Sequence, residues 1–267
     1  MNAKQNLMIE SFSGGDNDAV IRIMAAIEQD EFLLYCQRIV PLSGADPNVE
    51  YHEALIRLIE EEEGLMPPGA FFPLVEKYDL MPHLDRWVVR HIVEWAASRS
   101  RQHGQSTQTT FFINLALPTL SDQDFPAYVH DQISAHGVRP DLLCFEITDA
   151  GLMQRHDDAV VFVEKIRQHG CGVAISSFGR ERLSFVSLRG IKVDYLKIDG
   201  NIIFNVLRGA TDLAKVVSIA RVARSIGVRT VAEFVESEEC IVKLRGLGVD
   251  FVQGFGVSIP RPLSDLA

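Results

Sequence analysis

The sequence has few cysteines, a shortage of cations and no long apolar segment. Its 267 residues include four Cys, 26 Lys or Arg and 36 Asp or Glu, which gives a formal net charge of −10 at pH 7. No stretch approaches the roughly 18 consecutive apolar residues that a membrane span needs. The N-terminus also lacks the basic region and apolar segment of a secretory signal. We therefore expect a cytoplasmic protein without membrane contact.

The charge and the cysteines argue against two further classes of protein. A net negative charge opposes any broad attraction to nucleic acid, so we expect no DNA partner, and a phosphate-bearing ligand would need a local cationic pocket. The four cysteines are far apart and lack the CxxC spacing of metal or redox sites. We expect them to be buried, reduced thiols.

What the chain does have is a regular alternation of short apolar runs and segments with apolar residues at helical spacing. Hydrophobic residues make up 47% of the chain, enough for one large core. The runs that we predict as strands are 32–40, 50–58, 110–116, 142–148, 172–176, 193–199, 228–233 and 249–254. Strands that alternate with helices indicate an α/β fold with a parallel sheet. Eight of them in about 240 residues favour a closed (β/α)8 barrel of the TIM type.

The first two strands differ from the others. The link between them, PLSGADPNV, is short and rich in turn-forming residues. It predicts a hairpin, in which the first strand runs antiparallel to its neighbours. Residues 1–18 are expected to be a flexible N-terminus or linker, and residues 19–267 to form one barrel domain that begins with a helix at 19–29.

Polar side chains come late in most of the predicted strands. These side chains are Glu53, Asn114, Glu146, Lys197, Glu233 and Gln253. The C-terminal ends of barrel strands meet at one mouth, where barrel enzymes keep their active sites. Carboxylate and amide oxygens are typical ligands of Mg²⁺ or Mn²⁺, whereas Lys197 and Arg57 supply the cations that a phosphate group requires. The pattern therefore predicts metal-assisted phosphate-ester chemistry at this mouth.

The same residues carry a resemblance to a known family. The run HEALIRL contains Glu53, Ala54 and Leu55, followed by Arg57. Other segments match the family in the same order. CQRIVPL precedes HEALIRL, and FFINLA, FEIT, VDYLKIDG, VAEFVE and QGFGVSIPRPL follow it. From residue 20 to residue 263 the chain resembles the EAL-domain family of cyclic di-GMP phosphodiesterases. The resemblance implies a barrel with a reversed first strand and a site for cyclic di-GMP.

The resemblance also implies catalytic roles for individual residues. Glu53, Asn114 and Glu146 match metal ligands, and Glu233 matches a ligand or a base that acts on the attacking water. Lys197 matches the lysine that helps to hold this water.

Five further positions match groups that bind the nucleotide or support the site. Leu55 and Arg57 match a segment that holds the dinucleotide, with Arg57 on a phosphate. Gln37 falls near a guanine, and Glu236 and Gln253 match supporting groups.

The chain departs from the family at the end of the 172–176 run. Ser176 and Ser177 stand where the family has two adjacent aspartates, which the resemblance implies complete a two-metal site. The loop at 180–182, RER, replaces small residues. We therefore expect an incomplete metal site in which Lys197 and Glu233 are vestigial catalytic groups. The loss of two carboxylates also lessens the repulsion between a metal-free pocket and a phosphodiester.

Three functions stay open. The expected one is a degenerate EAL domain that binds cyclic di-GMP without hydrolysing it and signals to a partner protein, with no cofactor firmly implied. A docking module would have lost the nucleotide and would use the loop at 180–182 as its contact. A weak phosphodiesterase would need Mg²⁺ or Mn²⁺ and would release linear pGpG. A homodimer is compatible with all three.

Overall fold

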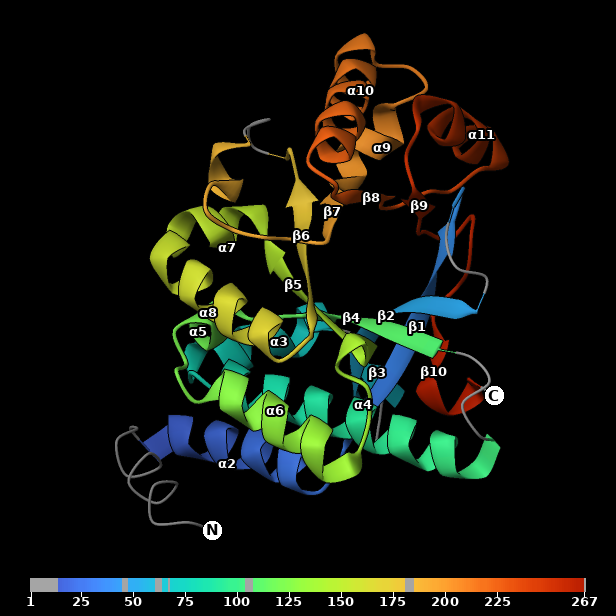
Figure 1. Cartoon of the computed structure of the whole chain (residues 1–267). Helices are drawn as coiled ribbons and strands as arrows, with labels where there is room; N and C mark the ends of the chain where they lie inside the picture. Colours follow the sequence, from blue (N-terminus) through green and yellow to red (C-terminus); the bar gives the residue numbers. More distant parts are fainter. Residues whose placement is uncertain are drawn as a thin grey trace.

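Eight strands close into a barrel in the computed structural model, which describes residues 14–44, 48–60, 64–66, 68–103, 108–180 and 185–266 (Figure 1). These strands are β1 (Phe32–Pro41), β2 (Val49–Glu60), β4 (Gln108–Asn114), β5 (Leu143–Thr148), β6 (Gly172–Phe178), β7 (Tyr195–Ile198), β8 (Arg229–Ala232) and β9 (Phe251–Val252). Strands β2 and β4 to β9 pair in parallel, and β1 pairs antiparallel with β2 and β9. The predicted TIM-type barrel with a reversed first strand is confirmed.

Helices cover the outside of the barrel. They are α2 (Gly14–Glu28), α3 (Pro68–Lys77), α4 (Met81–His103), α5 (Leu117–Leu120), α6 (Phe125–His136), α7 (Asp149–Gln154), α8 (His156–Gln168), α9 (Gly200–Asn205), α10 (Ala210–Ser225) and α11 (Glu238–Leu247). Figure 1 shows α2, α4 and α6 on one side and α9, α10 and α11 on the other. In the described part of the chain, no helix combines the length and hydropathy that a membrane crossing requires.

The N-terminal helix begins earlier than the sequence predicts. Helix α2 starts at Gly14, so residues 14–18, expected in the flexible terminus, are helical. Residues 1–13 lie outside the described part of the chain. The helix is tied to α4 through Asp30, which accepts hydrogen bonds from Trp87 Nε1 (2.9 Å) and Arg90 Nη2 (3.1 Å).

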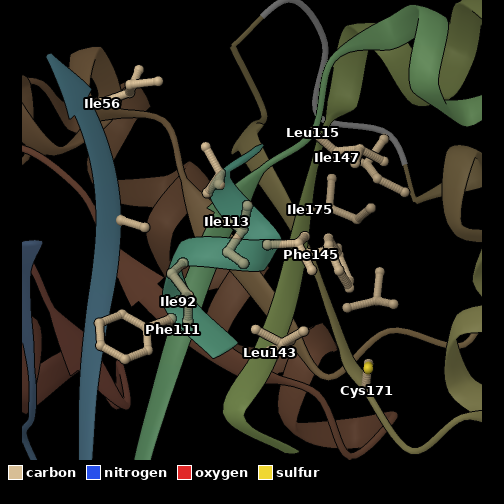
Figure 2. Packing of buried hydrophobic residues seen from close by; sticks show 14 of the residues in the cluster. Ile56, Ile92, Phe111, Ile113, Leu115, Leu143, Phe145, Ile147, Cys171 and Ile175 are labelled. Atoms are coloured by element: carbon tan, nitrogen blue, oxygen red, sulfur yellow. The ribbon is translucent and has the colours of Figure 1, made fainter. Parts of the chain in front are cut away.

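The alternation of side chains along each strand divides the core into two layers. In β4, Phe111 and Ile113 face the surrounding helices (Figure 2), whereas Phe112 faces the barrel interior. The interior layer is filled mainly by aromatic and aliphatic side chains. It comprises Ile39, Tyr51, Phe112, Cys144, Ala174, Tyr195, Val231 and Phe251. This layer fills the middle of the barrel and separates its two ends. All four cysteines are buried and free, as predicted.

Candidate functional site

A buried lysine joins carboxylates from three other strands at the C-terminal mouth. Lys197 of β7 has no solvent exposure, and its Nζ donates to Glu53 Oε2 at 2.8 Å and Glu146 Oε1 at 2.7 Å. Glu233 follows β8, and its Oε1 lies 3.3 Å from the same nitrogen. Because β2, β5, β7 and β8 run in parallel, residues at their ends meet although the chain separates them widely. The predicted convergence of these groups is therefore seen in the structure.

Glu53 is the most heavily bonded of these carboxylates. Asn114 Nδ2 donates to its Oε1 at 2.7 Å, and Gln253 Nε2 donates to its Oε2 at 2.6 Å. Gln253 Nε2 also donates to Gln37 Oε1 at 3.0 Å, and Gln37 Nε2 donates to the Ser258 carbonyl at 2.8 Å. The antiparallel register of β1 on β2 places Gln37 opposite Glu53. Both oxygens of Glu53 are thus satisfied within the protein.

Burial and mutual repulsion leave this cluster close to neutral. Burial raises the pKa of Glu146 to about 8; Lys197 opposes this rise, and the carboxylates of Glu53 and Glu233 add to it. Burial likewise raises the pKa of Glu233. For Glu53, burial acts in the same direction, but the attraction of Lys197 and the hydrogen bonds lower its pKa overall. An ionised Glu53–Lys197 pair beside a protonated Glu146 leaves at most one uncompensated negative charge.

Lys197 stays protonated in this environment. Burial disfavours its charge, yet the adjacent carboxylates hold its pKa well above the ordinary value. The ammonium group is therefore a fixed cation in the centre of the mouth.

Ser176 and Ser177 lie at an irregularity of the barrel wall. The pairing of β6 with β7 shifts between Ile175 and Phe178, so β6 carries an extra residue there. Ser176 is buried and pairs with Thr148 of β5, and Ser177 has a φ of +53°. A left-handed conformation is uncommon for serine and is tolerated better by asparagine, aspartate or glycine. β-bulges re-aim side chains and are frequent beside active sites.

The side chains present do not make up a two-metal centre. Hard divalent cations are bound through several oxygen ligands, with carboxylates to balance their charge. At the end of β6 the chain offers two neutral hydroxyl groups, and the Lys197 ammonium lies between the carboxylates. Among the described residues, no group of three or more His, Cys, Asp or Glu is arranged to hold a metal ion. In this arrangement the glutamate oxygens accept hydrogen bonds, and the Lys197 ammonium compensates their negative charge.

Arg57 lies on the strand that carries Glu53, farther toward the rim. It lies on β2 two and four residues beyond Leu55 and Glu53, so the three side chains share one face of the strand. Its Nη1 donates to the Ile56 carbonyl at 2.7 Å, and its guanidinium lies 5.7 Å from the Tyr35 ring centre. No carboxylate pairs with Arg57 within the described ranges, so most of its donors are free.

Other predicted residues lie apart from the cluster. Glu236 is exposed and forms no hydrogen bond or ion pair with the cluster in the part of the chain that is described. In the loop at 180–182, Arg180 is exposed, whereas Glu181 and Arg182 lie outside the described residues.

Exposed apolar side chains around the rim are a feature that the sequence reasoning missed. Phe234 (65% exposed), Phe255 (70%) and Ile259 (71%) follow β8 and β9, and Phe204 (68%) lies on α9. A β-carbon at Gly200 would collide with the Phe234 ring, so this glycine lets the ring lie against the start of α9. Sequence alone gives a weak signal here, because a phenylalanine in a loop is as compatible with burial as with exposure.

The fold and the site together define a TIM-type barrel whose mouth holds three glutamates around a buried lysine. The EAL domain family model matches residues 21–260, so the chain belongs to the EAL domain family. The chain is 31% identical over 244 residues to the cyclic di-GMP phosphodiesterase PdeF of Escherichia coli, covering 91% of this chain and 32% of PdeF. It is 34% identical over 244 residues to the cyclic di-GMP phosphodiesterase PdeB of Shewanella oneidensis, covering 91% of this chain and 28% of PdeB.

Solved structures agree with this assignment. The PaMucR phosphodiesterase in complex with c-di-GMP matches with a TM-score of 0.83 and 26% identity, over 94% of this chain and all of that one. The FimX EAL domain of Xanthomonas citri in complex with c-di-GMP matches with a TM-score of 0.84 and 25% identity, over 100% and 99% of the two chains. The chain spans about a third or less of the length of the two phosphodiesterases named above.

Proposed function

We propose that this domain binds cyclic di-GMP without hydrolysing it. The observation that carries the proposal is the pair of hydroxyl side chains, Ser176 and Ser177, at the end of β6 where two-metal chemistry would need carboxylates. Family membership and the cyclic di-GMP complexes of similar domains support the choice of ligand.

The electrostatics of the mouth support binding in the absence of metal. A phosphodiester carries a negative charge, and a mouth with several ionised carboxylates would repel it. Here Lys197 neutralises Glu53, and the pKa of Glu146 is raised to about 8, chiefly by burial. The free guanidinium of Arg57 adds a positive charge on the same face of β2. Charge-assisted hydrogen bonds from arginine to phosphate are among the strongest that proteins make.

We assign the ligand contacts accordingly. Arg57 binds a phosphate, and Leu55 packs against the dinucleotide on the same strand face. Gln37 can reach the guanine with its second N–H and its second lone pair, because its Nε2 donates to the Ser258 carbonyl and its Oε1 accepts from Gln253. Gln253 also donates to Glu53, so Gln37 and Glu53 belong to one hydrogen-bond network.

Calorimetric titration of Arg57→Ala with cyclic di-GMP in EDTA tests the ligand assignment. Hydrogen bonds to charged groups contribute about 1.5–3 kcal/mol, so we expect the affinity to fall about 10- to 150-fold. The matched control is Arg221→Ala, which removes an exposed arginine from α10 and should bind as the wild type does. Equal affinity of Arg57→Ala and wild type would refute the phosphate assignment.

A docking function is the second candidate, and the exposed rim favours it. Apolar side chains clustered on an exposed surface commonly mark protein contacts. Phe234 and Phe255 are exposed in two segments that hydrogen-bond to each other beside them, and Ile259 is exposed farther along the second segment. A signalling partner that binds there would contact the same mouth as the nucleotide. If wild-type protein gives no heat with cyclic di-GMP in EDTA or in Mn²⁺, docking alone becomes the better account.

Residual phosphodiesterase activity and self-association are separable by experiment. Release of linear pGpG in Mg²⁺ or Mn²⁺ would favour a weak enzyme over a receptor. Light scattering across a concentration series, with and without cyclic di-GMP, measures whether the domain forms a homodimer.

A further inference from the structure

Two adjoining pockets lie at the N-terminal end of the barrel, opposite the carboxylate mouth. Their volumes are about 350 and 320 Å³, and they share Gln108, Thr109 and Asp141 in their walls. The second pocket is lined by Gly172, Tyr195 and other residues at the starts of strands, whereas the candidate site lies at the strand ends. The N-terminal face is therefore spatially distinct from the mouth.

Arginine dominates the charge of these pockets. Their described walls contain five arginines against two aspartates, a surplus of three positive charges in a chain whose net charge is −10. The arginines are Arg99, Arg101, Arg139, Arg167 and Arg229. A chain with a net negative charge attracts an anion only where positive charge is locally in excess, as it is here.

Two of the five arginines are neutralised within the protein. Arg139 pairs with Asp141, and Arg167 Nη1 lies 2.5 Å from Asp194 Oδ2. The same oxygen of Asp194 accepts from the Val173 backbone at 2.9 Å. The other three arginines have no carboxylate partner among the residues that the structure describes.

Aromatic rings orient two of the unpaired guanidinium groups. Arg229 lies 4.2 Å from the Tyr195 ring centre and 5.7 Å from that of Phe251. Arg99 lies 5.3 Å from the Trp95 ring centre and donates to the Leu266 carbonyl at 3.1 Å. A guanidinium held against a ring keeps donors on its edge available for a phosphate or a carboxylate. These cations are thus already placed before any ligand arrives.

The walls also specify the body of the ligand. Trp95, Val138 and Leu142 line the first pocket beside Arg99 and Arg101, so apolar surface and positive charge lie together. Small-molecule sites commonly combine apolar walls with a few placed polar groups. A ligand that matches both features has an aromatic body and more than one negative charge.

We propose that the N-terminal face of the barrel is a second binding site, for a small molecule that carries phosphate groups on an aromatic body. This site is independent of the nucleotide proposed for the mouth, because Arg57, Lys197 and the serines are at the other end of the strands. Its cations are Arg99, Arg101 and Arg229.

Titration of the whole chain with ATP and with pyrophosphate, at low ionic strength, tests this proposal. ATP supplies both features and should bind saturably, and pyrophosphate, which lacks the aromatic body, should bind at least tenfold more weakly. The double variant Arg101→Ala and Arg229→Ala should weaken ATP binding at least tenfold. Both side chains are exposed, so thermal unfolding should confirm that the variant is folded.

The matched control is the double variant Arg221→Ala and Arg245→Ala. It makes the same change in net charge on the exposed faces of α10 and α11, and its ATP affinity should stay within twofold of the wild type. Three results would overturn the proposal: no saturable binding of ATP, an equal loss in the control, or loss of ATP binding in Arg57→Ala. The last result would place the ATP at the mouth.

A fluorescence signal locates the ligand further. The chain has two tryptophans, and of these Trp95 lines the pocket while Trp87 is 3% exposed in the core. ATP should change the emission of the wild type and leave that of Trp95→Phe unchanged. A persistent change in Trp95→Phe would argue against contact at this pocket.

Discussion

Replacing Lys197 with methionine should destabilise the domain strongly and in a pH-dependent manner. Methionine is unbranched like lysine and one atom shorter, and it removes the cation from a position with no solvent exposure. The carboxyl groups of Glu53, Glu146 and Glu233 would then face one another across the mouth without a counter-charge.

The contact distances set the size of the effect. The ammonium lies 2.7, 2.8 and 3.3 Å from oxygens of Glu146, Glu53 and Glu233. Unit charges about 4 Å apart attract by about 4 kcal/mol at an effective dielectric of about 20, but the desolvation of buried charges offsets much of this. Removing one partner of a buried pair costs about 3–5 kcal/mol, and we expect a loss of unfolding free energy in this range at pH 8.

The pH dependence follows from the sign of the pKa shifts. Without the lysine, the remaining carboxyls should have pKa values raised above the ordinary 4.5 of glutamate. A raised pKa means that the folded state binds more protons than the unfolded state, so stability falls as pH rises through the shifted values. The deficit of Lys197→Met should therefore shrink toward pH 5 and grow toward pH 8.

Urea denaturation of wild type and variant from pH 5 to pH 8 measures this deficit. The control is Lys192→Met, because Lys192 is exposed just before β7 and should change the unfolding free energy by less than about 0.5 kcal/mol. A deficit below about 1 kcal/mol for Lys197→Met at pH 8 would refute the reasoning, since a buried ion pair that loses one partner should lose several times more.

Three further predictions concern other parts of the barrel. The double variant Ser176→Asp and Ser177→Asp should unfold at a lower urea concentration than the wild type in EDTA and should regain stability in Mn²⁺. If Mn²⁺ does not change the stability of this variant, more than two metal ligands are missing. Burial raises the pKa of Asp85 to about 7 from 3.8, so wild-type stability should fall as pH rises from about 4 to about 7, by up to about 4 kcal/mol. The stability of Asp85→Asn should not show this fall. Parallel curves of unfolding free energy against pH for the wild type and Asp85→Asn would contradict the prediction. A β-carbon at Gly254 would collide with neighbouring backbone, whereas Gly246 in α11 has open space; Gly254→Ala should cost more than about 2 kcal/mol and Gly246→Ala should stabilise by up to about 1 kcal/mol in thermal unfolding.

The barrel was predictable because its signals are local. Short apolar runs separated by helical segments predict a parallel α/β fold, and the turn-rich link at 41–49 predicts the reversed first strand that the structure has. Strand ends were less accurate: the run 172–176 extends to Phe178 and the run 193–199 shortens to Tyr195–Ile198. The extension of β6 contains the bulge between Ile175 and Phe178, which is a tertiary feature without a sequence signature.

The sequence predicts that the site residues converge at one mouth, but it does not predict the hydrogen bonds between them. Parallel strands bring their ends together, so late polar residues such as Glu146 and Glu233 were expected at one mouth. The link from Gln37 through Gln253 to Glu53 depends on the register of the antiparallel hairpin. That register is decided by cross-strand packing.

The central claim is tested most directly by calorimetric titration of the wild-type domain with cyclic di-GMP in EDTA, with chromatography of the same samples after incubation in Mn²⁺. Binding without hydrolysis predicts saturable heat in EDTA and intact cyclic di-GMP after incubation. Conversion to linear pGpG in Mn²⁺, or no heat in EDTA, would contradict it.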